Sequence, residues 1–119
     1  MLAQAVEVLA IDEVGPLLAG GARGPFTAGE LAYARDKSDP ERRLAARLAA
    51  KRAAARLLGA AVEEADIEVV RAPGGAPRLR LSDRAEVELH AHGARAALVS
   101  LTHGRDYAAA VVLLVRGEA

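Results

Sequence analysis

Apolar residues recur along the chain in short runs that are bounded by turn-forming residues. These runs predict strands over residues 6–11, 67–70, 78–81, 97–102 and 107–115. The run 78–81 alternates arginine and leucine, which is the two-residue period of a strand with one buried face. Glycine and proline residues between positions 72 and 77 predict a hairpin or an irregular turn between two of the strands.

Two short segments carry the start signals of helices. Thr27 and Glu30 form a capping-box pattern, which predicts a short helix that ends near residue 34. Ser82 and Glu86 suggest a similar start, and this helix is expected to end near Gly93. The pairs 15–16 and 24–25 are both Gly-Pro, and with the glycines at 20 and 21 they predict a loop or a hinge before the first helix.

The clearest predicted element is a long helix in the middle of the chain. Asp39 is a suitable N-cap, and Pro40 suits the first helical position because its missing N–H would be unpaired there. The helix is expected to run to Leu58 and to end before Gly59. Strands, helices and strands in this order predict one α+β domain over residues 1–119, with an antiparallel sheet packed on the long helix.

The composition limits the class of protein. The chain has 119 residues, of which 52% are hydrophobic but only 3% aromatic, so the core must rely on aliphatic side chains and close backbone packing. Cysteine is absent, and neither a signal peptide nor a membrane-spanning run is evident, which predicts a cytoplasmic location and no membrane partner. The formal net charge is zero and aromatic residues are scarce, which argues against nucleic-acid binding.

The long helix orders its charges in stripes. A helical wheel places an apolar stripe toward the core, formed by Leu44, Leu48, Ala55 and Leu58. Arg43, Arg47 and Lys51 follow one another at four-residue spacing on one flank, and Arg52 and Arg56 lie on the other. Like charges at this spacing repel. The helix therefore either faces an anion or forms a solvated face paired with local acids such as Glu63 and Glu64.

Three blocks of residues together resemble a known family. They are Ile11-Asp12 after an apolar run, the helical sequence 46–53, and the sequence 100–103, Ser-Leu-Thr-His. In order and position they resemble the signature blocks of the holo-acyl-carrier-protein synthase family, the short class of 4'-phosphopantetheinyl transferases. The resemblance implies a 4'-phosphopantetheinyl transferase-like fold. It also implies transfer of phosphopantetheine from coenzyme A to a serine of an acyl carrier protein.

The resemblance also implies roles for individual residues. Asp12 would be a catalytic residue and a ligand of Mg²⁺, and Lys51 and His103 would be catalytic as well. The residues expected to contact coenzyme A are Arg47, Lys51, Arg56, Pro77, Ser100, Thr102 and His103. Pro77 belongs to a Gly-x-Pro turn at 75–77, where the backbone approaches the nucleotide. His90 and His92 are two apart on a predicted helix and are expected to be surface residues.

One position departs from the family pattern. Arg52 stands where the family has a metal-binding glutamate, and Ala10 replaces a glycine. A cation beside the site and the loss of a ligand both weaken Mg²⁺ binding. Three outcomes are open: Glu13 supplies the second carboxylate, Arg52 replaces the ion by pairing with Asp12, or the protein binds coenzyme A, a carrier protein or a partner subunit without transferring the arm.

The resemblance further predicts the partners. Short members of the family form trimers with active sites between subunits, which would suit a small alanine-rich core. Carrier proteins are usually acidic, so a basic edge formed by Arg35, Lys37, Arg42 and Arg43 is a candidate docking surface. The expected setting is a carrier-dependent pathway such as fatty acid biosynthesis.

Overall fold

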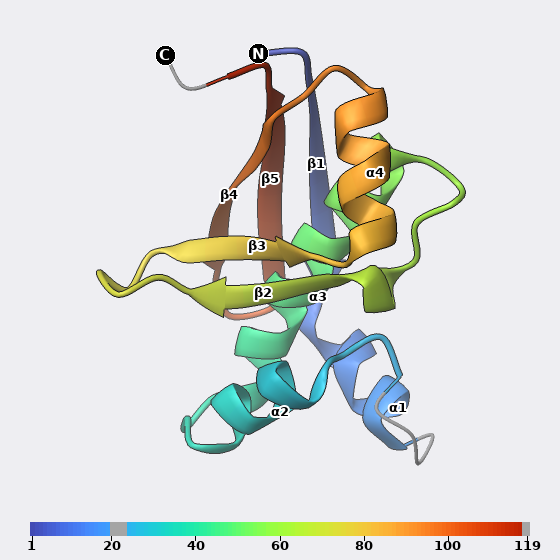
Figure 1. The fold of residues 1–119 in the computed structure, drawn as a ribbon. Coiled ribbons are helices and arrows are strands. Elements are labelled where there is room, and N and C mark those ends of the chain that lie inside the picture. Colours follow the sequence, from blue (N-terminus) through green and yellow to red (C-terminus); the bar gives the residue numbers. More distant parts are fainter. Residues whose placement is uncertain (20–23, 118–119) are drawn as a thin grey trace.

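The computed structural model describes residues 1–19 and 24–117 and is drawn in Figure 1. A three-stranded antiparallel sheet has the strand order β1-β5-β4, and β2 and β3 form a separate antiparallel hairpin. The predicted strands and helices are confirmed, as is the α+β class. In chain order the elements are β1 (Ala3–Ala10), a 3-10 turn (Ile11–Glu13), α1 (Val14–Ala19), α2 (Ala28–Arg35), α3 (Pro40–Leu58), a second 3-10 turn (Glu64–Asp66), β2 (Ile67–Arg71), β3 (Pro77–Leu81), α4 (Asp83–Ala91), β4 (Ala96–His103) and β5 (Tyr107–Val115).

The long helix α3 lies at the centre of the molecule. It packs on one face of the three-stranded sheet, and the β2-β3 hairpin crosses it on the other side, with α1 and α2 below (Figure 1). Its alanines at 45, 46, 49, 50, 53 and 54 are buried, and β5 opposes it with buried Ala108 and Ala110. Small residues on both elements allow the helix and the strand to approach closely, so the core is filled without aromatic bulk.

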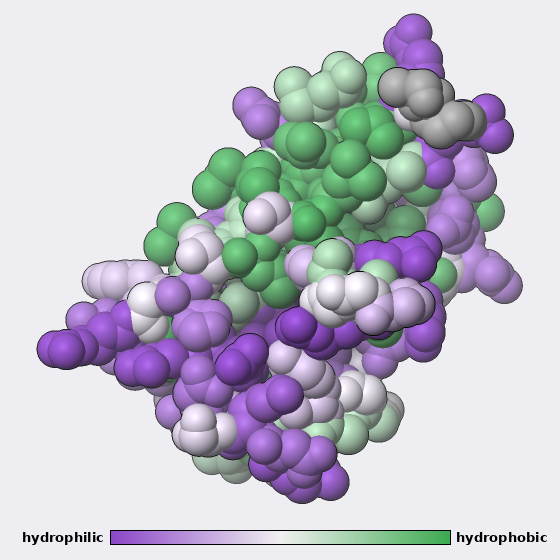
Figure 2. Space-filling view, turned by 90° about the vertical axis from the view of Figure 1, so that its left-hand side faces the viewer, coloured by the Kyte–Doolittle hydropathy of each residue, from purple (hydrophilic) through white to green (hydrophobic). Residues whose placement is uncertain are grey.

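The two faces of the sheet differ because successive strand residues point to opposite sides. The inner face of β5 is buried under α3 through Ala108, Ala110, Val112 and Leu114. The outer face carries Val6, Val8 and Leu98, each more than half exposed. Apolar side chains gather in the upper part of the face seen in Figure 2, while polar side chains cover its lower part. One face of this sheet is therefore apolar and uncovered.

The helix starts follow the predicted chemistry in two of three cases. The Thr27 hydroxyl accepts from the backbone N–H of Glu30, and the Ser82 hydroxyl accepts from that of Ala85, as N-caps do. Asp39 occupies the N-cap position of α3 but makes no capping hydrogen bond. Its carboxylate instead accepts from Nε of Arg43 at 3.0 Å, because a charged donor one turn along the helix competes for it.

Two expectations are corrected by the fold. Gly15 and Pro16, predicted as a loop, lie in the first turn of α1, where a proline lacking its N–H breaks no hydrogen bond. Residues 20–23 of the other predicted loop lie outside the described residues. Arg47 and Lys51, predicted on a flank of the long helix, are enclosed, because α2 and the hairpin cover the side of α3 that the sheet leaves open.

Among the described residues, no helix combines the length and the apolar character that crossing a bilayer would need.

Candidate functional site

A cationic cavity of about 230 Å³ lies where α3, the tip of the hairpin and the end of β4 meet. We call it the arginine cavity, and its lining consists of Arg43, Ala46, Arg47, Arg71, Gly75, Pro77, Leu101 and His103. The lining has three guanidinium groups and an imidazole but no carboxylate. Guanidinium groups bind phosphate oxygens through paired N–H donors, so the chemistry of this cavity suits a phosphorylated ligand.

Arg47 is the most buried of these cations, with only 3% of the residue exposed. Burial lowers the pKa of its guanidinium, although the nearby Tyr33 phenol and Glu30 act in the opposite direction. One Nη donates to the carbonyl of Arg43 at 3.5 Å, while Nε has no hydrogen-bond partner among the residues that the structure describes. An unpaired buried donor beside a cavity is costly unless a ligand satisfies it.

Three of the predicted coenzyme A contacts meet here. Arg47 comes from α3, Pro77 from the start of β3 and His103 from the end of β4, and all three line the arginine cavity. The structure adds Arg71, which sequence reasoning missed. The available signal was its position as the last residue of a strand before a Gly/Pro turn, where side chains converge on the turn.

Ser100 and Thr102 do not join this group within one chain. They pair across the sheet with Val111 and Ala109, whereas His103 pairs with the buried Ala108. Alternation along β4 therefore directs Ser100 and Thr102 to the outer apolar face and His103 to the opposite side. The sequence pattern Ser-x-Thr-His places the two hydroxyls together but separates them from the histidine.

Arg56 and Lys51 are engaged elsewhere. The guanidinium of Arg56 forms an ion pair with Glu7 and donates to the carbonyl of Val6 at 2.9 Å, so it lies across β1. The ammonium of Lys51 is fully buried against the carboxylate of Glu30, at 2.6 Å. Lys51 is a structural cation in this arrangement, and a contact with coenzyme A would require its ammonium to leave Glu30.

Asp12 lines a different cavity, of about 400 Å³, next to the turn between β4 and β5. Its neighbours in the lining include Glu41, at the start of α3, and Arg105 and Asp106 in the turn. The arginine cavity is lined from neighbouring positions, by Arg43 two residues along α3 from Glu41 and by His103 two residues before Arg105. The two cavities therefore lie near each other, and Asp12 is exposed to solvent.

Arg52 leaves Asp12 without the second carboxylate that the family pattern gives to a Mg²⁺ site. Arg52, at the position where the family has a carboxylate ligand, pairs through Nε with Glu64 at 3.3 Å and through Nη1 with Glu13 at 3.9 Å. The described ranges contain no group of three or more carboxylate, histidine or cysteine side chains that could hold a metal. Arg52 therefore pairs with Glu13 and Glu64 rather than with Asp12, and the Glu13 carboxylate is already neutralised by a guanidinium.

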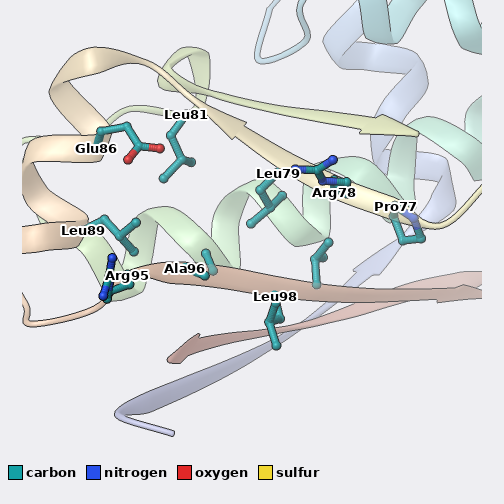
Figure 3. Close-up of a pocket in the computed structure, with 11 residues that line it drawn as sticks. Pro77, Arg78, Leu79, Leu81, Glu86, Leu89, Arg95, Ala96 and Leu98 are labelled. Carbon is teal, nitrogen blue, oxygen red and sulfur yellow. The ribbon is translucent and has the colours of Figure 1, made fainter. Parts of the chain in front are cut away.

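A further cavity, of about 330 Å³, lies between β3, α4 and the start of β4. Figure 3 shows Leu79 and Leu81 facing Leu89 and Ala96 across it, with Arg95 and Glu86 at its side. Of the predicted site residues only Pro77 lines it, and Pro77 also lines the arginine cavity, whereas Arg43, Arg47, Arg71 and His103 do not line it.

Comparison with known proteins gives a consistent answer. No protein-family model matches the chain. The holo-[acyl-carrier-protein] synthase of Nitratidesulfovibrio vulgaris is 48% identical over 81 residues, a match that spans 65% of this chain and 65% of that relative, just under two thirds. The Frankia casuarinae synthase is 41% identical over 113 residues and covers 91% of this chain and 92% of its own.

Solved structures agree on the fold. The holo-[acyl-carrier-protein] synthase of Helicobacter pylori, solved in complex with coenzyme A, superposes with a TM-score of 0.77 at 19% identity, covering 94% of this chain and 99% of that one. The acyl carrier protein synthase of Mycobacterium tuberculosis has a TM-score of 0.69 at 33% identity, covering 93% and 94%. Sequence identity above 30% extends over nine tenths of the chain, and the fold is the same. The chain therefore belongs to the holo-[acyl-carrier-protein] synthase family.

Proposed function

We propose that this protein transfers the 4'-phosphopantetheine arm of coenzyme A to a serine of an acyl carrier protein. Family membership supports the type of reaction, and the arginine cavity is the single observation that supports coenzyme A as the substrate. Coenzyme A has a diphosphate and a 3'-phosphate, and Arg43, Arg47, Arg71 and His103 give a carboxylate-free lining with matching donors. We place the reaction in the cytoplasm and in a carrier-dependent pathway such as fatty acid biosynthesis.

In the proposed reaction the carrier serine Oγ attacks the phosphorus that bears the pantetheine arm. A bond forms between Oγ and phosphorus, and the anhydride bond to the 3',5'-ADP half breaks, so that half leaves with the electron pair. The cavity cations hold the phosphate oxygens while charge moves onto the leaving group, which is the main demand of phosphoryl-type transfer. Asp12, exposed in the nearby cavity, accepts the serine proton.

The carrier protein is expected to dock beside these cavities. Arg35 and Lys37 are exposed and Arg42 is partly exposed, all at the end of the molecule where α2 leads into α3. Arg43, first grouped with them, lines the arginine cavity and pairs with Asp39. The proposed docking edge therefore consists of Arg35, Lys37 and Arg42, which complement an acidic partner.

We also propose that the active form is a homotrimer. The outer face of the sheet exposes Val6, Val8 and Leu98, an apolar surface of the kind that subunit contacts bury. Ser100 and Thr102 lie on this same face, away from His103. Their predicted contact with coenzyme A therefore requires a site shared between two copies.

The test is to incubate the protein with coenzyme A and an apo-carrier protein and to measure the carrier's intact mass. A phosphopantetheine adduct that is lost in Asp12→Ala would support the transferase. The pairing of Arg52 with Glu13 and Glu64 favours one alternative, a relative that binds coenzyme A or a carrier without transfer. Coenzyme A binding by calorimetry with no adduct, under conditions where an active synthase modifies the same carrier, would establish that alternative.

A further inference from the structure

The arginine cavity depends on a side chain that does not line it. Tyr33, on α2, lies behind the guanidinium groups and lines a neighbouring cavity of about 280 Å³ together with Arg47 and Arg71. The two cavities therefore share these arginines as a common wall. Glu68 lines the neighbouring cavity, whereas the arginine cavity has no carboxylate in its lining. An anion is therefore favoured on the arginine-cavity side of the wall.

Tyr33 contacts all three arginines of that cavity. Nη1 of Arg71 donates to Tyr33 Oη at 3.1 Å, and Nη1 of Arg43 donates to the same oxygen at 3.3 Å. The guanidinium carbon of Arg47 lies 4.0 Å from the centroid of the Tyr33 ring, in a cation–π contact. One phenol thus fixes guanidinium groups from both α3 and the end of β2.

The charges around Tyr33 are unbalanced. Burial raises the pKa of the Tyr33 phenol, but the charges of Arg47, Arg71, Arg43 and Lys37 together outweigh it and hold that pKa below its usual value. Among the described residues, the Asp39 carboxylate pairs with Arg43. Three guanidinium groups held this closely repel one another unless an anion joins them, and the buried Nε of Arg47 is a donor without a partner among the described residues.

We propose that Tyr33 is a positioning residue that holds Arg43, Arg47 and Arg71 in place to bind a phosphate group of coenzyme A, and that Arg71 donates to that phosphate directly. The inference rests on the proposed function. Tyr33 acts through the arginines and does not touch the ligand, because it lies on the far side of their guanidinium groups. Its effect is therefore expected on binding of coenzyme A and not on the chemical step.

The test compares Tyr33→Phe with the unmodified protein. The variant keeps the ring on Arg47 and removes only the oxygen that accepts from Arg43 and Arg71. Calorimetry should give a Kd for coenzyme A that is about three- to tenfold higher, the effect of losing one or two hydrogen bonds that order charged groups. In the transfer assay KM should rise by the same factor while kcat is unchanged.

A second variant keeps the proposal testable if Tyr33→Phe does not fold. Arg71 is exposed, so Arg71→Gln should fold normally and weaken coenzyme A binding about tenfold or more, since it removes a charged donor. Arg78→Gln is the matched control, because Arg78 is an exposed cation of the neighbouring strand that lines neither the arginine cavity nor the cavity behind Tyr33. Its Kd for coenzyme A should equal that of the unmodified protein.

A parallel titration with 3'-dephospho-coenzyme A identifies the phosphate. If the arginines hold the 3'-phosphate, Tyr33→Phe changes the affinity for coenzyme A alone; if they hold the diphosphate, it weakens both ligands equally. The inference is overturned if folded Tyr33→Phe and Arg71→Gln proteins bind coenzyme A as tightly as the unmodified protein does. A fall in kcat with KM unchanged would overturn it as well. Failure of the unmodified protein to bind coenzyme A would instead contradict the proposed function.

Discussion

Nζ of Lys51 lies 2.6 Å from Oε1 of Glu30, and both side chains are fully buried. Glu30 also accepts from the backbone N–H groups of Thr27 and Val69, so one carboxylate joins the cap of α2, the middle of α3 and strand β2. A buried ion pair is favourable only when its remaining lone pairs are satisfied, and these backbone donors satisfy them. The pair explains how a lysine is accommodated inside an alanine-rich core.

The first prediction concerns this pair. Lys51→Met keeps the length of the side chain but leaves the Glu30 carboxylate buried without a counter-charge. We expect the free energy of unfolding to fall by about 3–5 kcal/mol, measured by urea denaturation. Adding Glu30→Gln to that variant should recover part of the loss, because the uncompensated charge is then gone.

The same variants decide between two roles for Lys51. If Lys51 is structural, the stability loss is large and the double variant regains both stability and coenzyme A binding. Unchanged stability in Lys51→Met together with lost coenzyme A binding would show that Lys51 contacts the substrate, as the family resemblance implies.

The sequence was a good guide to the elements and a poor one to their contacts. The caps at Thr27 and Ser82, the helix end at Gly59 and the alternation of 78–81 are local signals, and the structure follows each of them. The burial of Arg47 and Lys51 could not be predicted, because it arises when α2 and the hairpin fold over α3. Periodicity identifies the face of a helix that meets the sheet but not what covers its other side.

The site shows the same limit. Arg47, Pro77 and His103 were predicted from motifs and meet in the arginine cavity. Tyr33 and Arg71 carry no motif, and only the packing of α2 and of the hairpin against α3 brings them to the same place. The family motif groups Ser100 and Thr102 with His103, but within one chain the alternation of the strand turns them to the face opposite the histidine.

A second prediction concerns acid stability at the start of α4. The Asp66 carboxylate accepts from the backbone N–H of Glu63 and the hydroxyl of Ser82, both at 2.8 Å, and from Arg84 at 3.0 Å. The backbone hydrogen bond from Glu63 is the main cause that holds the pKa of Asp66 below its usual value, with Ser82 and Arg84 adding to it against the opposing effect of burial.

Because the folded pKa is depressed, this stabilisation is fully present above the unfolded pKa of about 3.9 and is lost as the pH falls through the folded value. Asp66→Asn should therefore lower the free energy of unfolding by about 1–2 kcal/mol at neutral pH. Below the folded pKa the variant and the unmodified protein should be equally stable in urea titrations. A difference that persists undiminished in acid would mean that packing, not charge, is responsible.

A third prediction tests the apolar sheet face. Leu98→Glu places a charge on the exposed outer face, where association would bury it at a large cost. We expect the proposed trimer to dissociate to monomers in light-scattering chromatography, and coenzyme A affinity to fall if Ser100 and Thr102 act across the interface. Val87→Glu is the control, since Val87 is equally apolar and exposed but lies on α4. An unmodified protein that is monomeric and binds coenzyme A fully would refute the shared site.

The last prediction concerns Arg52. Its guanidinium neutralises Glu13 and Glu64, so Arg52→Glu brings three carboxylates together at this position. Each of the lost pairs is about one-third or more exposed, so their removal should cost less than about 1 kcal/mol. Clustered carboxylates repel, but they also form the oxygen-rich environment that Mg²⁺ prefers. We therefore expect the variant to unfold at a lower temperature without divalent ions and to gain stability when millimolar Mg²⁺ is added.

Two controls make this result specific to the residue. Arg52→Gln also loses both ion pairs but adds no carboxylate, so its melting temperature should not respond to Mg²⁺ beyond the effect of an equal ionic strength of NaCl. The unmodified protein should behave in the same way, and its coenzyme A binding should be insensitive to a chelator. If the unmodified protein instead gains stability with Mg²⁺ and loses transfer activity with the chelator, then Asp12 holds the ion despite Arg52. The guanidinium would in that case have to swing away from Glu13 and leave that carboxylate free to complete the site.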